Sequence, residues 1–319
     1  IAYFKAKGEG HRSHIVGRDR AYHGMNIGGI SVGGMVANRK TFSNILMPNV
    51  HHLRHTLLKE NLFVKGEPET GAYLADDLER IAANIGGENI AACIVEPIAG
   101  STGCLVPPKG YLKRLREICD KHGILLIFDE VITGWGRTGE SFAAQSFDVT
   151  PDIITMAKGI TNGVMPLGAV ASRESIYDTL LDASPTGAIE FFHGYTYSAI
   201  PPCIAAGLAM QEIFKKENLI QRSKNMSPYF LDGLFSLKDI DIITDIRGYG
   251  MLGGIDIKFN ERLGKAGYSC FKKLFEVGLS LKATGDCLCV APPFICEEHH
   301  IDEIIDKLRA GITNYRKSV

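Results

Sequence analysis

The 319-residue sequence has no excess of charge of either sign and no long apolar run. Its 35 basic and 36 acidic residues give a net charge of −1, so neither nucleic acid nor an anionic membrane surface is indicated as a partner. No apolar run approaches the roughly 18 residues that a membrane span needs, and no secretory signal opens the sequence. We therefore expect no membrane partner and a cytoplasmic location.

Closely spaced cysteine pairs are also scarce, although the chain has eight cysteines. Cys93 and Cys203 lie in apolar context and are expected to be small core residues. Cys287-x-Cys289 has no second pair, so we expect no metal site there. His51-His52-x-x-His55 lacks the acidic partner that a zinc protease helix would need, and we interpret it as a surface loop.

Two glycine pairs, Gly28-Gly29 and Gly33-Gly34, raise the question of a phosphate-binding loop. They lack the strand-loop-helix setting and the spacing of the known phosphate-binding motifs. We therefore expect these four residues to be loop glycines.

The order of apolar segments predicts an α/β fold. Apolar residues that recur on one face predict a helix over 76–85. A buried strand over 90–95, an amphipathic helix over 108–122 and a strand over 124–128 form one strand-helix-strand unit. Repetition of such units predicts a mostly parallel central sheet with helices on both faces. From about residue 215 the pattern changes to shorter strands and charged helices, so we expect a large domain over 1–214 and a smaller α+β domain over 215–319.

The stretch from Ile124 to Gly159 combines two short apolar runs with a charged residue after each. The first run is long enough for one buried strand and stops at Asp129. The second, Ile153–Met156, follows a turn signal and is succeeded by Lys158. Ligands of open α/β sheets sit beyond the carboxyl ends of the strands, so we expect Asp129 and Lys158 to face one crevice.

A carboxylate and a lysine in one crevice can serve a particular chemistry. A buried carboxylate keeps a heterocyclic nitrogen protonated, and a partly desolvated lysine can form a Schiff base with an aldehyde. Together these are what a pyridoxal phosphate enzyme needs. Spacing alone leaves a plainer alternative open, in which Asp129 and Lys158 are a solvated sheet edge or a helix cap.

The identities of the residues in this stretch are more specific than the spacing of the two charged residues. The segments FDEVITGWGRTG and PDIITMAKGITNG resemble the class III (omega) aminotransferases, which are pyridoxal phosphate enzymes of fold type I. The segments MNIGGISVGGMVANRKTF and FFHGYTYS are similar to the subgroup of omega-amino acid (β-alanine):pyruvate aminotransferases. The resemblance extends over essentially the whole chain and implies pyridoxal 5′-phosphate as the cofactor.

The resemblance implies roles for individual residues. Asp129 contacts the pyridine nitrogen, Val131 packs on the ring, and Lys158 bonds covalently to the cofactor. The YHG motif places Tyr22 against the ring and brings His23 to the same site. Further assignments concern Glu96, whose carboxylate lies near the aspartate, and Thr196, which binds the cofactor phosphate of the neighbouring subunit. The last assignment implies a homodimer, or a dimer of dimers, with shared active sites.

Two positions depart from common family patterns. Several relatives carry a second glutamate five residues after the first, where this chain has Ser101. Relatives usually have an arginine where this chain has Lys282, and that arginine holds the substrate carboxylate through two hydrogen bonds. Lysine is a point charge without the fork, so Lys282 is a candidate substrate residue, and a solvated lysine on a strand edge is the alternative.

The family also begins with a long segment that contains a Ser-Gly-Ser phosphate loop, which these 319 residues do not include. We therefore expect an N-terminally truncated chain that binds pyridoxal phosphate weakly unless another polypeptide completes the site. The expected reaction moves an amino group from an omega-amino acid or amine to pyruvate, giving a semialdehyde or ketone and alanine. A diamine or ornithine aminotransferase, a related decarboxylase or aminomutase, and an inactive binding partner remain alternatives.

Overall fold

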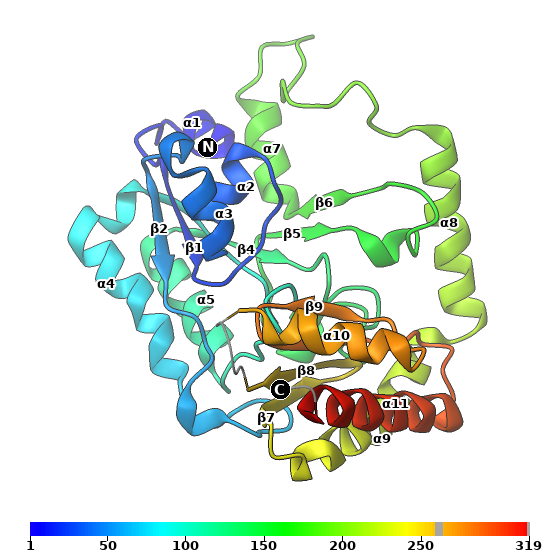
Figure 1. Ribbon diagram of the computed structural model, residues 1–319. Helices are drawn as coiled ribbons and strands as arrows, with labels where there is room; N and C mark the ends of the chain where they lie inside the picture. Colours follow the sequence, from blue (N-terminus) through cyan, green and yellow to red (C-terminus); the bar gives the residue numbers. More distant parts are fainter. Residues whose placement is uncertain (259–263, 318–319) are drawn as a thin grey trace.

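The computed structural model describes residues 1–258 and 264–317. Within these residues the chain forms a six-stranded sheet, in the order β2-β1-β3-β4-β5-β6, and a four-stranded sheet (Figure 1). The strands of the larger sheet are β1 His14–Arg18, β2 Val50–Leu53, β3 Ile90–Val95, β4 Leu125–Asp129, β5 Ile153–Met156 and β6 Ala169–Ser172. Neighbouring strands are parallel except for β5 and β6, which confirms the mostly parallel sheet.

The larger sheet is covered on one face by α4 (Asp76–Ile85) and α5 (Tyr111–His122). The helices and strands share one hydrophobic core, because their apolar residues recur at the spacing that places them on a single face. Its fully buried members include Leu78, Leu115, Leu126 and Phe128. Strands buried on both faces read as continuous apolar runs, as β3 does with IAACIV.

The opposite face of β1 contacts α2 (Ile27–Val32). Successive residues of a strand point to opposite faces, so Val16 belongs to the core with α4 and α5 while Gly17 faces α2. A Cβ atom on Gly17 would lie 2.0 Å from the carbonyl oxygen of Val32. Glycine is therefore required at this position because the end of α2 lies directly on the strand.

The remaining helices of the first part of the chain are short, apart from those that flank the exposed segment 183–200. They are α1 Ala2–Ala6, α3 Val36–Thr41, α6 Ala143–Ser146, α7 Glu174–Asp182 and α8 Pro201–Lys216. Among the residues described, no helix is both long enough and apolar enough to cross a membrane.

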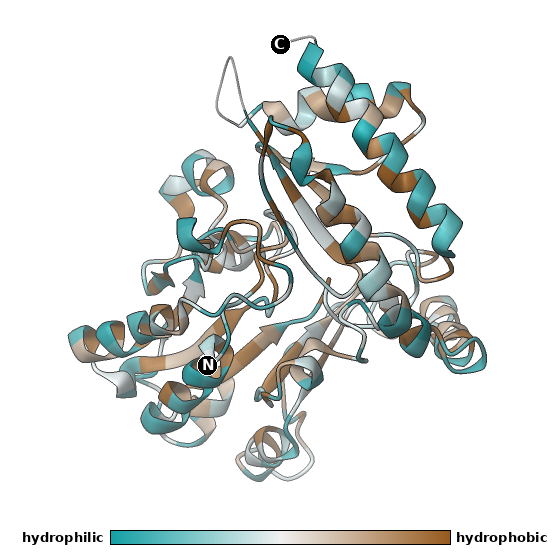
Figure 2. Ribbon diagram, turned by 90° about the horizontal axis from the view of Figure 1, so that it is seen from below, coloured by the Kyte–Doolittle hydropathy of each residue, from teal (hydrophilic) through white to brown (hydrophobic). Residues whose placement is uncertain are grey.

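The smaller sheet has the order β7-β8-β10-β9, and all its neighbours are antiparallel. Its strands are β7 Ile243–Tyr249, β8 Leu252–Ile257, β9 Lys282–Thr284 and β10 Cys287–Val290. The helices α9 (Leu219–Phe235), α10 (Ala266–Glu276) and α11 (Glu298–Lys317) share a hydrophobic core with this sheet. Figure 2 shows hydrophilic and hydrophobic residues alternating along these helices, as expected for helices with one buried face.

The two sheets are joined by contacts between distant parts of the chain. Lys65 forms a parallel bridge with Gly248 of β7, and the Phe63 amide donates to the Asp245 carboxylate at 2.6 Å. The Arg137 guanidinium donates to the carbonyl oxygens of Met251 and Pro292. The domain division after residue 214 remains a prediction.

Three sequence-based expectations need correction. Gly28 and Gly29 lie in α2 and not in a loop. Glycine is needed at position 29 for close packing, because a Cβ there would lie 2.5 Å from the His23 carbonyl oxygen. His51 and His52 belong to β2, which pairs with β1. The helix expected from residue 108 begins at Tyr111. The bounds of α4, β3 and β5 agree with the predicted ones.

Candidate active site

Asp129 and Lys158 lie at neighbouring strand ends of the larger sheet. Asp129 is the last residue of β4 and pairs in register with Thr155 of the parallel strand β5. Lys158 follows the end of β5 by two residues. The crevice expected between these ends is a cavity of about 290 Å³. It is lined by Tyr22, His23, Gly24, Ile94, Glu96, Ser101, Asp129, Val131, Ile132, Thr155 and Lys158.

The Asp129 carboxylate is held by two donors. Its Oδ1 accepts a hydrogen bond from the Val131 amide at 3.1 Å, and its Oδ2 lies 2.8 Å from His23 Nδ1. A carboxylate can only accept, so Nδ1 of His23 carries the hydrogen in this contact. The other ring nitrogen of His23, Nε2, is buried and has no hydrogen-bond partner within the described part of the chain. Asp129 itself is 8% exposed and lines the cavity, and each of its oxygens can accept a further hydrogen bond.

Glu96 ties two loops of the cavity wall together. Its Oε1 accepts a hydrogen bond from the Tyr22 amide at 2.9 Å, and its Oε2 accepts one from the Gly100 amide at 3.0 Å. Burial raises the pKa of the Glu96 carboxyl, although His23 and the Tyr22 amide act in the opposite direction. Glu96 therefore fixes the segments on which Tyr22 and Ser101 are carried.

Lys158 has an unusual backbone conformation. Its φ is +44°, in the left-handed region that side chains other than glycine seldom adopt. The following residue, Gly159, lies against Trp135, and a Cβ there would be 2.6 Å from the Cβ atom of Trp135. Strained backbone of this kind persists only where the surrounding structure imposes it.

The charge state of Lys158 is shifted toward the neutral amine. Desolvation lowers the pKa of the Lys158 ammonium group, the carboxylates of Asp129 and Glu96 oppose this, and Lys282 adds to it. The side chain is nevertheless exposed to solvent through the open cavity. A neutral amine is the nucleophilic form of lysine, so this environment suits attack on a carbonyl carbon.

The second carboxylate of the Asp-Glu pair has a different place. Glu130 is fully buried and faces away from the cavity, where it accepts hydrogen bonds from the Thr133 hydroxyl and from the amides of Ala143 and Ala144. These amides open α6, so Glu130 caps that helix. Spacing alone did not distinguish this structural carboxylate from its neighbour Asp129, which only the family resemblance had assigned to the cofactor.

Six of the eight residues assigned from the sequence line the one cavity: Tyr22, His23, Glu96, Asp129, Val131 and Lys158. Thr196 lies apart from them, exposed in the segment between α7 and α8. Lys282 begins β9 and lines an adjacent cavity of about 280 Å³ together with Gly100, Ile132 and Cys289. Ile132 is common to both cavities, so Lys282 stands beside the site of Lys158 without lining it.

Five lining residues were not assigned from the sequence: Gly24, Ile94, Ser101, Ile132 and Thr155. Thr155 could have been found from strand alternation, because it stands opposite Asp129 near the end of the neighbouring strand. Ser101 was noted only as a departure from a family pattern, since its place depends on the fold of the loop after β3.

The lining groups fit pyridoxal phosphate. A carboxylate with free lone pairs can hold a protonated ring nitrogen, and an amine with a lowered pKa can bond to an aldehyde. Tyr22 and Val131 provide an aromatic and an apolar surface in the same cavity, which suits a flat ring. In the ranges 1–258 and 264–317 no cluster of three or more histidine, cysteine or acidic side chains could hold a metal ion.

Comparisons with known proteins agree with this chemistry. The family profile of the class-III aminotransferases matches residues 1–312. An omega-aminotransferase from Caulobacter vibrioides is 50% identical over 311 residues, covering 97% of this chain and 70% of that protein. An omega-amino acid–pyruvate aminotransferase from Pseudomonas putida is 46% identical, covering 96% of this chain and 68% of that protein. The omega transaminase from Pseudomonas jessenii in complex with PMP has a TM-score of 0.93 at 28% identity, covering 100% of this chain and 72% of that chain.

Proposed function

The chain belongs to the class-III aminotransferases, and from this premise we propose that it transfers an amino group from an omega-amino acid or amine to pyruvate. The products are a semialdehyde or ketone and alanine. The observation that carries the proposal is the meeting of Asp129 and Lys158 in one cavity at neighbouring strand ends.

The cavity residues would hold pyridoxal phosphate in defined roles. We propose that Asp129 keeps the proton on the ring nitrogen, with His23 fixing the carboxylate from behind. Tyr22 and Val131 would flank the ring, and Lys158 would bond to the cofactor. Bound pyridoxal phosphate supplies an electron sink for the negative charge that develops on the amine-bearing carbon of the substrate.

Lys158 is proposed to be the catalytic acid and base. Its lowered pKa favours the neutral amine, which can take a proton from the amine-bearing carbon, and the resulting ammonium can return it. Asp129 and Glu96 stabilise that ammonium, because their carboxylates act on Lys158 in the direction that raises its pKa.

We propose that Lys282 contacts the donor carboxylate. It stands beside the cavity of Lys158, and the apolar side chains around it, such as Leu279 and Leu281, provide a surface for the carbon chain of an omega-amino acid. A single ammonium group attracts a carboxylate without imposing one geometry, so donors of different lengths can reach it.

A homodimer with shared active sites is the proposed assembly. Large hydrophobic side chains are exposed on β6, on α8 and on the segment between α7 and α8, all on one side of the molecule (Figure 1). They include Val170, Phe192, Tyr195, Tyr197 and Leu208. Extended exposed patches of this kind mark interaction surfaces, and Thr196 lies among them, which supports its proposed role toward a partner's cofactor.

The eight cysteines are free thiols, which supports the proposed location in the reducing cytoplasm. We also retain the proposal of a large domain over 1–214 and a small one over 215–319.

The test is formation of alanine from pyruvate, with β-alanine, putrescine and a simple primary amine as alternative donors. Because weak cofactor binding is expected, pyridoxal phosphate is supplied in excess; wild-type protein should then form alanine, and Lys158→Ala should form none. Release of carbon dioxide without alanine would replace the proposal by decarboxylation. If the protein binds the cofactor but forms neither product, the alternative of an inactive homologue would be supported.

A further inference from the structure

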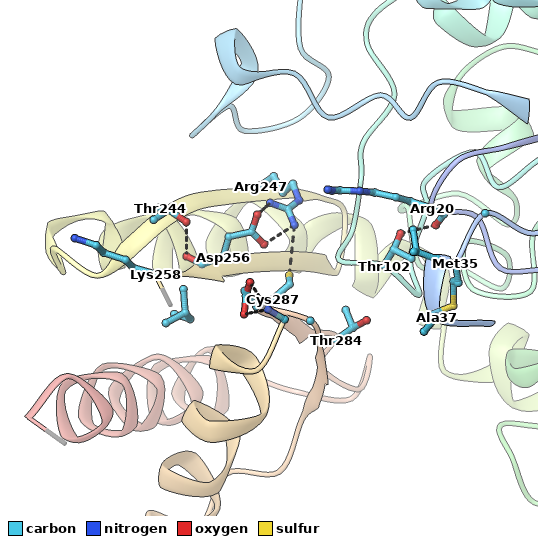
Figure 3. A pocket seen from close by; sticks show the side chains of 16 residues that line it. Arg20, Met35, Ala37, Thr102, Thr244, Arg247, Asp256, Lys258, Thr284 and Cys287 are labelled. Carbon is cyan, nitrogen blue, oxygen red and sulfur yellow. Dashed lines mark hydrogen bonds and ion pairs between the residues drawn. The ribbon is translucent and has the colours of Figure 1, made fainter. Parts of the chain in front are cut away.

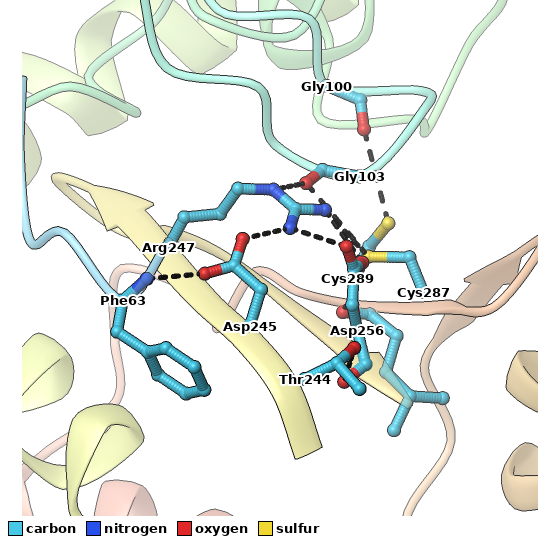
Figure 4. A network of polar contacts seen from close by, with 10 residues as sticks. Phe63, Gly100, Gly103, Thr244, Asp245, Arg247, Asp256, Cys287 and Cys289 are labelled. Carbon is cyan, nitrogen blue, oxygen red and sulfur yellow. Dashed lines mark hydrogen bonds and ion pairs between the residues drawn. The ribbon is translucent and has the colours of Figure 1, made fainter. Parts of the chain in front are cut away.

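Arg247 of β7 is a buried arginine outside the cavity, and its guanidinium donates to two carboxylates, a carbonyl oxygen and the sulfur of Cys287 (Figure 4). Its Nη1 donates to Asp245 at 2.6 Å and to Asp256 at 2.9 Å, and its Nη2 donates to Asp256 at 2.8 Å. Its Nε donates to the carbonyl oxygen of Gly103 at 2.7 Å. Gly103 belongs to the loop after β3, so a side chain of the smaller sheet holds a loop that follows a strand of the larger sheet.

The segment Ala99–Leu105 contains Gly103 and contributes Ser101 to the cavity of Lys158, so it is named the cavity loop. Its ends form an antiparallel bridge, and its Gly100 amide donates to Glu96. Gly103 has a φ of +113°, and a Cβ on it would lie 2.8 Å from Arg247 Nη2. Glycine is required there both for its backbone conformation and for the close approach of the guanidinium.

The cavity loop has two sides that face different spaces. Ser101 is 8% exposed and lines the cavity of Lys158. Thr102 lines a hollow of about 470 Å³ on the other side, together with Arg247 and Asp256, and its hydroxyl donates to the Arg20 carbonyl oxygen (Figure 3). The cavity loop therefore borders both the hollow that Arg247 lines and the cavity of Lys158.

The geometry of Arg247 is set by its carboxylates. Asp256 receives two parallel N–H groups, which fixes the plane of the guanidinium and with it the direction of the Nε–H bond. Asp245 is itself held by the Phe63 amide. A lysine would keep the positive charge, but it could not donate two parallel N–H groups to Asp256 and a third N–H group to the Gly103 carbonyl oxygen in this fixed geometry.

We infer that Arg247 is a positioning residue for the proposed transamination. It fixes the cavity loop through Gly103 and thereby places the Ser101 hydroxyl where it hydrogen-bonds the substrate bound at Lys158. Within the described ranges no protein group forms a hydrogen bond with this hydroxyl, so it is available to a ligand. The inference rests on the proposed function, because it specifies a second polar group of the same site.

The main test is Arg247→Lys. The hollow beside Arg247 admits water, which can solvate the carboxylates that lysine leaves unpaired, so we expect the variant to fold. Amide hydrogen exchange in the cavity loop should accelerate, and kcat/KM should fall roughly tenfold to a hundredfold, as expected for a misplaced reactive geometry. Arg309→Lys is the matched control, because Arg309 also binds a carboxylate and a carbonyl oxygen in the small domain, but its side chain is 40% exposed.

A double-mutant cycle with Ser101→Ala separates positioning from a general structural role. If Arg247 acts through Ser101, Arg247→Lys should cost little further kcat/KM in the Ser101→Ala background. Additive losses would overturn the inference, as would unchanged loop exchange in Arg247→Lys. If Arg247→Lys does not fold, Gly103→Ala displaces the same loop without leaving charge unpaired, and it must then reproduce both effects for the inference to stand.

The two proposals fail separately. Hydrogen exchange reports on the cavity loop without turnover, so unchanged exchange contradicts the role of Arg247 whatever the enzyme does. Lack of alanine formation in the wild type contradicts the proposed function and leaves the exchange result unaffected.

Discussion

The Oδ2 atom of Asp129 lies 2.8 Å from Nδ1 of His23, and this contact joins the end of β4 to the loop after β1. Since the second oxygen of Asp129 is held by the Val131 amide, the carboxylate has a fixed orientation. A preoriented carboxylate can stabilise a positive charge without first reorganising, which is how enzymes obtain large electrostatic effects.

Asp129→Asn should therefore damage the chemical step more than binding. The amide is similar in shape but removes the charge that keeps the ring nitrogen protonated. We expect the activation free energy to rise by about 3 kcal/mol, which lowers kcat roughly a hundredfold or more. Steady-state kinetics and a cofactor titration measure the two effects. Near-normal turnover would mean that the ring nitrogen is held by another group.

Borohydride treatment of the loaded protein should attach the cofactor irreversibly to Lys158. Lys158 combines a lowered pKa with a place in the cavity, which makes it the reactive amine. Peptide mapping by mass spectrometry locates the label. A label on Lys282 would contradict the assignment, and Lys158→Ala serves as the unlabelled control.

The rate of cofactor attachment should depend on pH through the neutral amine of Lys158. Lys282 lowers the pKa of Lys158, so Lys282→Met should raise that pKa and move the rising limb of the profile to higher pH. Glu96 raises the pKa of Lys158, so Glu96→Gln should move the limb to lower pH. Stopped-flow absorbance at a series of pH values checks both signs. Lys273→Met, on the surface helix α10, is the control and should move neither limb.

Lys282→Met should also discriminate between donors. A charged hydrogen bond to the donor carboxylate contributes about 1.5–3 kcal/mol, so the KM for β-alanine should rise about tenfold to a hundredfold. An amine without a carboxylate should keep its KM at saturating pyruvate. Equal changes in KM for both donors would show that Lys282 does not bind the carboxylate and is a solvated lysine at the start of β9.

Thr196→Val should weaken cofactor binding if the threonine reaches the partner's site. Loss of one hydrogen bond to a phosphate costs about 1.5–3 kcal/mol, whereas Thr196→Ser should keep most of the affinity. A second variant, Phe192→Glu, should lower the dimer fraction in sedimentation, because Phe192 is exposed in the same segment. A cofactor affinity that Thr196→Val leaves unchanged in a confirmed dimer would contradict the shared site.

Elements whose pattern is local could be predicted from the sequence. The periodic helix α4 and the apolar strands β3 and β5 carry their signal within their own residues, and Asp129 and Lys158 follow from the ends of such strands. What could not be predicted depends on distant partners. The glycine-rich α2 forms because it packs closely on β1, and β2 forms because it pairs with the same strand.

The same reason separates Asp129 from Glu130. By spacing alone the adjacent carboxylates look equivalent, because the amides of Ala143 and Ala144 that bind Glu130 lie 13 and 14 residues further along the chain. Ser101 was noticed as unusual, and its place in the cavity became visible only with Gly103 held by Arg247.

The left-handed backbone of Lys158 has a consequence for engineering. A residue with φ of +44° stores conformational energy that the folded chain must supply from elsewhere. Selection for thermal stability alone would favour glycine at this position, since glycine adopts the conformation freely. The substitution would also remove the reactive amine. Stabilised variants of this protein therefore have to be screened for turnover, because Lys158→Gly would relieve the backbone strain and at the same time abolish the reaction.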